Sequence, residues 1–276
     1  MTSRRTGRRT GRRPARCRTA RAVALAAVLA CAAGCGPAEE GSGTPSAAER
    51  ALRATERAVD RAGSARVEST TVMGDRLSLE AVGALGWGDA LTGTLTITYT
   101  GGTAADTLRA LGTTSTEARY LPDGYYARMG EELADRAGGR HWIRYRYDDL
   151  AEPTDGKGEG AGRTDLADGL GLRAGTPDRS VRLLLAADDL RSTGPETVRG
   201  RRAVHYTGTV DAPGVHTVDL WVDDRHLPVK EVQRGGPDSG RPTRTTYYTD
   251  YGTEVSAQPP PARDTADFRE LLRAGG

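Results

Sequence analysis

Cysteine, aromatic residues and long apolar runs are all scarce in this chain of 276 residues. It contains three cysteines and one phenylalanine, and aromatic residues make up 5% of it. All three cysteines lie within the first 35 residues, so a domain that follows them has to fold without disulfide bonds. The uncharged stretch 22–34 has 13 residues, whereas a helix that spans a membrane needs about 20 apolar residues. This stretch is therefore too short to remain as a transmembrane anchor.

The N-terminal segment has the composition of an export signal. Residues 1–21 hold nine arginines and no acidic residue, and the apolar stretch that follows them ends in small residues. A basic head, a short apolar segment and small residues before a cleavage site are typical of secretory signal peptides. The plain interpretation is an ordinary secretory signal that is cut close to these small residues.

The sequence AAGC at 32–35 is more specific, because it resembles the lipobox of bacterial lipoproteins. Cleavage before Cys35 frees a thiol and an amine for a diacylglycerol and an acyl chain such as palmitate. Each buried methylene contributes about 0.8 kcal/mol, so two or three chains hold firmly where one holds weakly. VLAC, which ends at Cys31, is a competing site, but Leu29 is large where a small residue is preferred. The predicted divisions of the chain are a signal peptide at 1–34, a lipidated cysteine with a flexible tether at 35–45, and a folded domain at 46–276.

Removal of such a signal reverses the sign of the net charge. The full sequence has 39 basic and 37 acidic residues, and without the nine N-terminal arginines 30 basic residues face 37 acidic ones, a formal charge of about −7. Proteins that bind nucleic acid carry basic surfaces, so the mature chain is not expected to bind it. We expect the protein at the extracytoplasmic face of a bacterial cell membrane, held there by its lipid and not by its surface charge.

Three segments of the domain have the pattern of helices. The first, at 46–62, begins with the capping box that Ser46 and Glu49 form. Apolar residues at spacings of three and four predict two further helices at 176–188 and 264–275. Each of the three helices therefore has one apolar stripe with which it can cover a sheet.

The remainder of the domain has the pattern of strands. From Ala65 onward the apolar period changes to two, and the clearest examples are at 92–100, 203–210, 216–224 and 245–252. About ten short strands with turns between them are predicted. Alternation with one polar face indicates an antiparallel meander that has one apolar and one solvated side. The predicted fold class is therefore α+β.

Several motifs occur in the order in which a known family has them. Between the lipobox and the C-terminus the chain contains YLPDGYYARM, HWIRY, GPETVRGRRAVHYTGTV, DLWVDDRHLPVKEV, YTDYGTEV and PPP. In this order they resemble the LppX/LprA/LprF/LprG lipoproteins, a branch of the LolA-like lipid-carrier superfamily. The resemblance implies a strongly curved, unclosed antiparallel half-barrel with helices packed on its concave face and a cavity for acyl chains. It brings no catalytic motif and no cofactor.

Motifs for catalysis or metal binding are weak. GKGEGA at 156–161 satisfies a relaxed dinucleotide pattern, but it lies in the Gly- and Asp-rich stretch 154–175, which is predicted to be a loop. The four histidines lack the spacing of metal ligands, and the Asp pairs fall where turn and capping roles are expected. We therefore predict no enzyme and no metal site, with His205 and His216 solvated and the three tryptophans packed.

The predicted function is to bind a lipid or another amphiphile in an apolar cavity and to carry it across the envelope. Affinity would come from apolar burial at about 25 cal/mol for each Å², and a few polar groups would fix the head group. Two alternatives stay open, a non-catalytic interaction or sensor lipoprotein with the same fold and a filled interior, and a surface hydrolase. The residues predicted to line the cavity are Leu95, Ile97, Tyr99, Val181, Leu184, Leu185, Val218 and Leu220.

Overall fold

The structure is a computed structural model that describes residues 45–147, 175–212, 214–236 and 241–274. The predicted signal peptide, Cys31, Cys35 and nearly the whole tether lie outside the described residues, as does the GKGEGA motif. The boundaries proposed for these segments therefore stay predictions. Within the described ranges, no helix is both long enough and apolar enough to cross a membrane.

The first helix, α1 (Ala47–Ala62), begins and ends as its sequence predicts. The Ser46 hydroxyl accepts a hydrogen bond from the backbone N–H of Glu49, and the Glu49 carboxylate accepts one from the N–H of Ser46. Gly63 ends the helix with a φ of 63°, a left-handed conformation that glycine adopts without steric cost. Leu52 is fully buried, so one face of α1 packs on the rest of the domain.

Twelve strands form a single sheet that makes up most of the domain. They are β1 (Ser64–Met73), β2 (Leu77–Gly86), β3 (Thr92–Gly101), β4 (Ser115–Leu121), β5 (Gly124–Arg128), β6 (Trp142–Tyr145), β7 (Arg191–Val198), β8 (Arg201–Ala212), β9 (Val215–Asp223), β10 (Pro228–Arg234), β11 (Thr243–Thr249) and β12 (Thr265–Asp267). The edge strands β7 and β12 bring the number above the ten that the sequence predicts.

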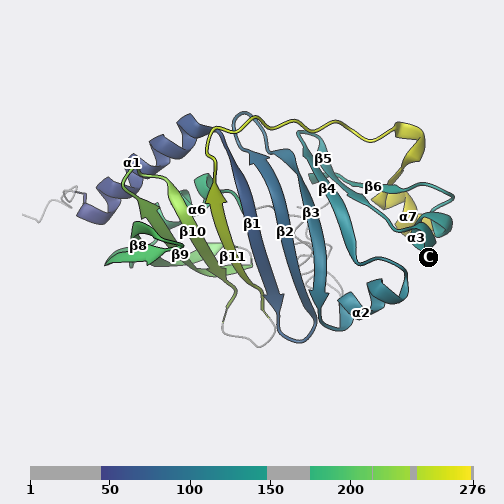
Figure 1. Ribbon diagram of the computed structural model, residues 1–276, viewed down its shortest axis with the longest axis horizontal. Helices are drawn as coiled ribbons and strands as arrows, with labels where there is room; N and C mark the ends of the chain where they lie inside the picture. Colours follow the sequence, from purple (N-terminus) through teal and green to yellow (C-terminus); the bar gives the residue numbers. More distant parts are fainter. Residues whose placement is uncertain (1–44, 148–174, 213, 237–240, 275–276) are drawn as a thin grey trace, which may run out of the picture. The chain divides into compact units, whose positions relative to one another are not determined.

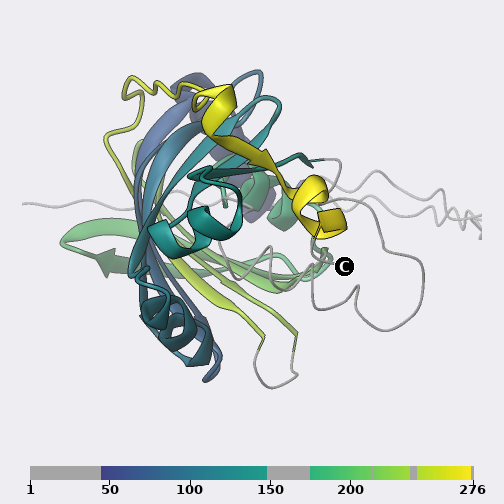
Figure 2. The same cartoon turned by 90° about the vertical axis from the view of Figure 1, so that its right-hand side faces the viewer.

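The strand order is β12-β6-β5-β4-β3-β2-β1-β11-β10-β9-β8-β7. Neighbouring strands are antiparallel except for β12 and β6, which run parallel. The edge strands β12 and β7 do not pair with each other, so the sheet is not closed. Figures 1 and 2 show it bending until one face is strongly concave. The predicted α+β half-barrel is confirmed.

The bend has a local cause on β2 and β3. A Cβ added at Gly83 would lie 2.1 Å from the carbonyl oxygen of Thr94, and one added at Gly93 would lie 2.3 Å from the carbonyl oxygen of Ala84. No side chain fits at such distances. Glycines inside strands mark places where backbones approach closely or bend, and this pair lets two long neighbouring strands coil together.

Helix α6 (Pro177–Leu185) lies on the concave face and packs with α1 against β8 and β9. It is shorter than the predicted span 176–188, because Ala186 already serves as its C-cap. The sequence does not predict two further short helices, α2 (Thr103–Ala110) and α3 (Glu131–Arg136). Both lie in connections between strands and each buries a single alanine, which is too weak a stripe to detect.

The last helix, α7 (Phe268–Ala274), begins later than the predicted span 264–275. A 3₁₀ turn (Ala262–Asp264) and strand β12 take the place of its first residues. Tertiary pairing explains the difference, because β12 forms a parallel ladder with β6. The Asp264 carboxylate also accepts a hydrogen bond from the backbone N–H of His141 at 2.9 Å, which fixes the turn against the sheet.

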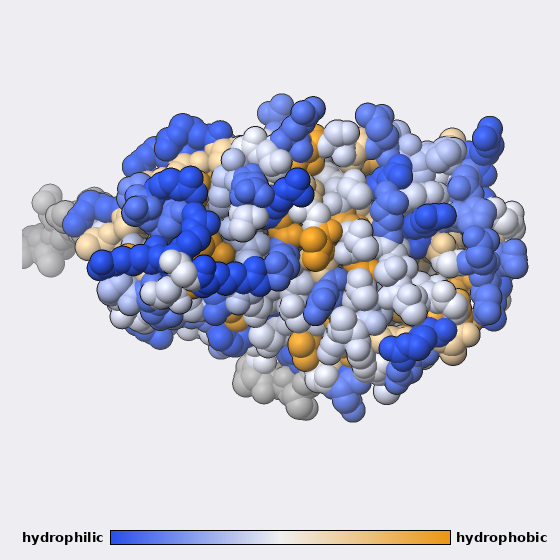
Figure 3. Space-filling view, viewed as in Figure 1, coloured by the Kyte–Doolittle hydropathy of each residue, from blue (hydrophilic) through white to orange (hydrophobic). Residues whose placement is uncertain are grey.

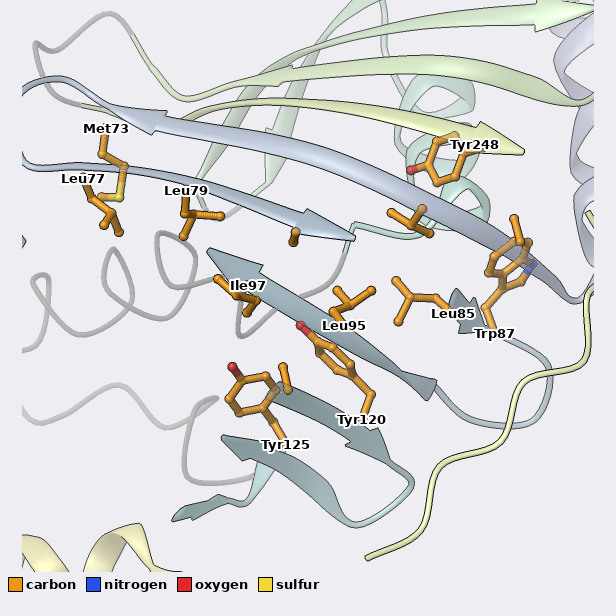
Figure 4. Packing of buried hydrophobic residues seen from close by; sticks show 14 of the residues in the cluster. Met73, Leu77, Leu79, Leu85, Trp87, Leu95, Ile97, Tyr120, Tyr125 and Tyr248 are labelled. Carbon is orange, nitrogen blue, oxygen red and sulfur yellow. The ribbon is translucent and has the colours of Figure 1, made fainter. Parts of the chain in front are cut away.

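Buried apolar side chains form two separate clusters on the concave side. The first lies mainly on β1 to β5, with Val59 of α1 and Tyr248 of β11, and Figure 4 shows its side chains rising from neighbouring strands toward one another. The second lies between α1, α6 and strands β8 and β9. Trp87 and Trp142 are buried, at 8% and 6% exposure, as predicted. The members of the second cluster are Leu52, Val181, Leu184, Tyr206, Val210, Val218, Leu220 and Val222.

The convex face is only partly solvated. Figure 3 shows it as mostly hydrophilic, and Val72 and Val82 are the large apolar side chains that are exposed among the described residues. His216 is exposed, as predicted. Trp221 and Asp219, in contrast, are buried although alternation places them on this face. A small convex cluster around Trp221 excludes water from them, and it consists of Val198, Ala203, Trp221, Val229 and Val232.

The prediction that His205 is solvated is wrong. Its ring stacks on Trp221 with centroids 4.2 Å apart and planes inclined by 8°. Its Nε2 lies 2.9 Å from Asp219, and its Nδ1 lies 3.1 Å from Glu196 and 2.8 Å from the Thr193 hydroxyl. Cross-strand contacts between β7, β8 and β9 therefore use this side chain as a link, which a single strand cannot reveal.

We expect Leu184→Ala to lower the free energy of unfolding by about 2–5 kcal/mol, because it empties a fully buried position between α6 and the sheet. Leu185→Ala is the matched control, since Leu185 is only partly buried beside the same cluster. Urea unfolding followed by circular dichroism measures both. An equal loss at the two positions would contradict the packing of α6 described here.

Candidate functional site

The concave surface of β1, β2 and β3 forms an apolar wall, because every second side chain of a strand points to the same face. A small cavity of about 20 Å³ lies on it. Such a volume holds one water molecule. We call this surface the trough wall and define it by Val67, Leu79, Ala81, Leu85, Leu95 and Ile97. The polar end of the cavity is lined by Ser69, Thr71, Gly175, Arg244 and Thr246.

The eight residues predicted to line a cavity fall into two groups. Leu95 and Ile97 lie on the trough wall, and Tyr99 packs at the edge of the same cluster. The other five pack on one another in the second cluster, against Leu52 of α1. The structure therefore does not bring the two groups together. The residues of the second group are Val181, Leu184, Leu185, Val218 and Leu220.

A band of polar side chains separates the two apolar clusters. Strands β10 and β11 lie between β1 and β9 in the sheet, and on the concave side they bear Glu231, Gln233, Thr246 and Tyr248, which face Ser180 of α6. All five are buried. We call these five residues the polar band. It interrupts what would otherwise be one continuous apolar surface.

Hydrogen bonds in this band join α6 to the sheet and strand β11 to strand β10. The side-chain amide of Gln233 donates to the Ser180 hydroxyl at 2.9 Å. The Tyr248 hydroxyl donates to Oε2 of Glu231 at 2.9 Å. Since both bonds are fully buried, water does not compete with them, and breaking either one would leave a desolvated polar group without a partner.

Glu231 is the most constrained member of the polar band. It is completely buried, and burial raises the pKa of its carboxyl above the usual value, against the opposing effects of its hydrogen bond with Tyr248 and of the nearby Arg244. Its Oε1 has no hydrogen-bond partner, and neither has the hydroxyl of Thr246, which lies directly opposite on β11. Two unpaired polar atoms therefore lie close together at one end of the trough wall.

Gly175, just before α6, covers this point. A Cβ added to it would lie 3.1 Å from a guanidinium nitrogen of Arg244 and 3.6 Å from Oε1 of Glu231. The two groups therefore face the same small volume, and Thr246 lines the cavity beside them. Because residue 175 has no side chain, the point stays free of protein carbon.

Sequence reasoning missed the polar band because of an irregularity in β10. The pairing of β10 with β9 shifts between Pro228 and Lys230, and this bulge lets Val229 join Val232 in the convex cluster. A regular strand cannot place two residues that are three apart on one face. That spacing of valines is the signal from which the burial of Glu231 could have been inferred.

A larger groove lies where the C-terminal half of α1 meets the ends of β8 and β11. It has a volume of about 640 Å³ and is lined by Arg61, Arg201, Arg225, Leu227 and Tyr251, among others. Its lining mixes arginine side chains with apolar ones. Among the described residues, no group of three or more His, Cys, Asp or Glu side chains is placed to hold a metal ion.

The fold and the site define an unclosed half-barrel with an apolar concave wall and a polar end. No protein-family model matches the chain. A protein of Streptomyces coelicolor described as "Putative lipoprotein SCO4650" is 61% identical over 226 residues, 82% of this chain and 77% of that protein. A Streptomyces griseus protein, "Uncharacterized 31.2 kDa protein in rplA-rplJ intergenic region", is 43% identical over 253 residues, 82% and 81% of the two chains. The chain belongs to the same family as these two proteins.

Solved structures similar to the chain include LprF from Mycobacterium bovis. The TM-score is 0.42 at 14% identity, and the match covers 79% of this chain and 99% of LprF. LprF is one of the lipoproteins that the sequence motifs resemble. The half-barrel itself is established by the strand order and the open edges of this sheet.

We expect Glu231→Gln to flatten the pH dependence of stability. Because the folded protein binds this proton more tightly than the unfolded chain does, wild-type stability falls as pH rises from about 4.5 through the raised pKa of Glu231. The amide of the variant has no proton to lose, so the variant gains stability relative to wild type as pH rises above about 4.5. Denaturant unfolding at a series of pH values measures the effect, with Glu80→Gln on the solvated side of β2 as control. Parallel pH profiles of wild type and Glu231→Gln would contradict it.

Proposed function

We propose that this protein is a bacterial envelope lipoprotein that is anchored through Cys35 at the extracytoplasmic face of the cell membrane and binds the hydrocarbon part of an amphiphile. The anchor is supported by the basic head, the short apolar stretch and the AAGC sequence at 32–35. It is also supported by a family relative whose description reads "Putative lipoprotein". Two or three acyl chains on one cysteine would make the attachment lasting.

The observation that carries the binding proposal is the trough wall. It is a concave apolar surface on an unclosed sheet. Small residues such as Ala81 and Gly83 lie between its leucines, so the surface is recessed there. Its six residues are at most 4% exposed, so a hydrocarbon tail would take the place of the atoms that now cover them and keep the wall out of water. The polar end supplies the few groups that orient a ligand. An apolar surface of this kind with one polar end matches the two-part chemistry of an amphiphile.

Binding requires a local movement. The cavity of about 20 Å³ on the trough wall has no room for an acyl chain. Gly175 and Arg244 line its polar end, so both would have to shift to make room as a chain enters. We call this arrangement, in which the trough wall is covered, the closed form.

The same small volume favours a second candidate function. A half-barrel whose trough wall is covered in this way can serve as an interaction module on the membrane surface without lipid cargo. The large groove beside α1, with Arg61, Arg201 and Arg225, gives such a module a place for contact. The two candidates share the anchor and the fold and differ only in whether the trough wall takes a ligand.

Cys35→Ser should abolish membrane attachment, because serine offers no thiol for the diacylglycerol. We expect wild type in the membrane fraction with a mass that includes the lipid, and the variant uncleaved or released to the medium, as measured by fractionation and intact mass spectrometry. Cys31→Ser is the matched control and should behave as wild type. Loss of attachment in Cys31→Ser alone would move the cleavage site to residue 31.

Wild-type protein extracted under mild conditions should carry a bound lipid of defined mass in native mass spectrometry. Ala81→Phe should lack it, because the new ring fills the trough wall at a position that is 4% exposed. Val82→Phe is the matched control, since Val82 points to the convex face and is 55% exposed. Thermal melts would show that both variants are folded. Wild type free of lipid, under conditions that keep lipid on a known carrier, would favour the interaction module.

A further inference from the structure

The buried polar atoms at the end of the trough wall have no function in holding the closed form together. Glu231 Oε1 and the Thr246 hydroxyl are both desolvated and both lack a partner. An unpaired buried polar group costs about 1–3 kcal/mol, so the fold is less stable for having them. The remaining contacts of the polar band, from Tyr248 to Glu231 and from Gln233 to Ser180, do not use either atom.

The Oε1 of Glu231 and the hydroxyl of Thr246 lie close to the guanidinium group of Arg244. Glu231 and Thr246 are directly opposed on neighbouring strands, which brings their side chains within about 5 Å of each other on the same face. Arg244 approaches from the same strand as Thr246, two residues away, and reaches the point under Gly175. The hydroxyl of Thr246 and the guanidinium of Arg244 line the same cavity as the apolar residues of the trough wall.

Hydrogen-bond donors predominate at this point. Thr246 can donate its hydroxyl proton, and Arg244 has only donors. The unpaired Oε1 of Glu231 can share one proton with a second carboxyl group. A carboxyl head group therefore fits this point, because its oxygens can accept from Thr246 and Arg244 and share that proton with Glu231.

We propose that Glu231, Arg244 and Thr246 form a subsite for the carboxylate end of a fatty acid or a similar acidic single-chain amphiphile, whose hydrocarbon tail lies along the trough wall. This subsite rests on the proposed binding function and specifies its ligand class. It gives the chain a direction, with the acid under Gly175 and the tail running over Ala81 toward Leu95. An ammonium group in the same place would face Arg244 and would be rejected.

The variant Thr246→Val tests whether the Thr246 hydroxyl contributes to ligand binding or to the stability of the fold. It removes one hydroxyl and keeps the shape of the side chain. Because that hydroxyl has no partner in the closed form, its loss should leave the melting temperature of the free protein unchanged or raise it. The affinity for lauric acid should nevertheless fall about tenfold, equivalent to about 1.4 kcal/mol.

Calorimetric titration of delipidated protein with lauric acid, dodecylamine and dodecanol tests the proposal. Thr245→Val is the matched control, because it removes the hydroxyl of the neighbouring residue on the other face of β11. Support consists of lauric acid binding to wild type and to Thr245→Val, about tenfold weaker binding to Thr246→Val, and weaker binding of dodecylamine.

Two results would overturn the subsite and leave the proposed function intact. One is equal binding of lauric acid to wild type and Thr246→Val, which would mean that a water molecule occupies the point. The other is dodecylamine binding as tightly as lauric acid. If wild type binds none of the three probes and carries no lipid on extraction, the proposed function and the subsite fall together.

Discussion

The packing of this domain depends on one constraint, which is that its strongly bent sheet is not closed. In a closed barrel the first and last strands pair with each other, and the side chains of the sheet fill the interior. Here β7 and β12 remain edges. The two halves of the concave face are treated differently. Over β8 and β9, α6 and α1 cover the sheet, and Val181, Leu184 and Leu52 are completely buried.

The half that β1 to β5 form relies on large side chains of the sheet itself. Tyr120 and Tyr125 pack edge to face with ring centroids 5.1 Å apart, and Tyr145 continues the row toward Phe268 at 4.7 Å. Figure 4 shows the first two rings leaning toward Leu95 and Ile97. Such rings bury much area with few rotatable bonds. The single phenylalanine of the chain is thus used where a helix closes the end of the row.

Sequence patterns sufficed for much of this architecture, because its determinants are local. The capping box of Ser46 and Glu49, and the alternation that puts Leu95 and Ile97 on one face, each act within a few residues. Features that depend on pairing between distant segments could not be predicted from the sequence. The parallel pairing of β12 with β6 overrides the helical pattern after Asp264, and the bulge before Lys230 decides on which side Glu231 is buried. For the same reason, only the apolar part of the candidate site could be predicted from the sequence. That part follows the alternation of the strands, whereas the polar part depends on the pairing between β10 and β11.

The polar band also explains how a closed form can coexist with the ability to open. Replacing Glu231 and Gln233 with apolar residues would merge the two clusters and bind α6 more firmly, since buried polar groups seldom stabilise a fold as well as hydrocarbon does. The hydrogen bonds from Gln233 to Ser180 and from Tyr248 to the carbonyl of Gly175 instead set the position of α6 at defined points. The unpaired atoms of Glu231 and Thr246 lower the stability of the closed form at the one place where Gly175 covers the trough wall. A partner that satisfies them recovers that free energy, so the weakest point of the closed form is also the point at which a ligand is stabilised most.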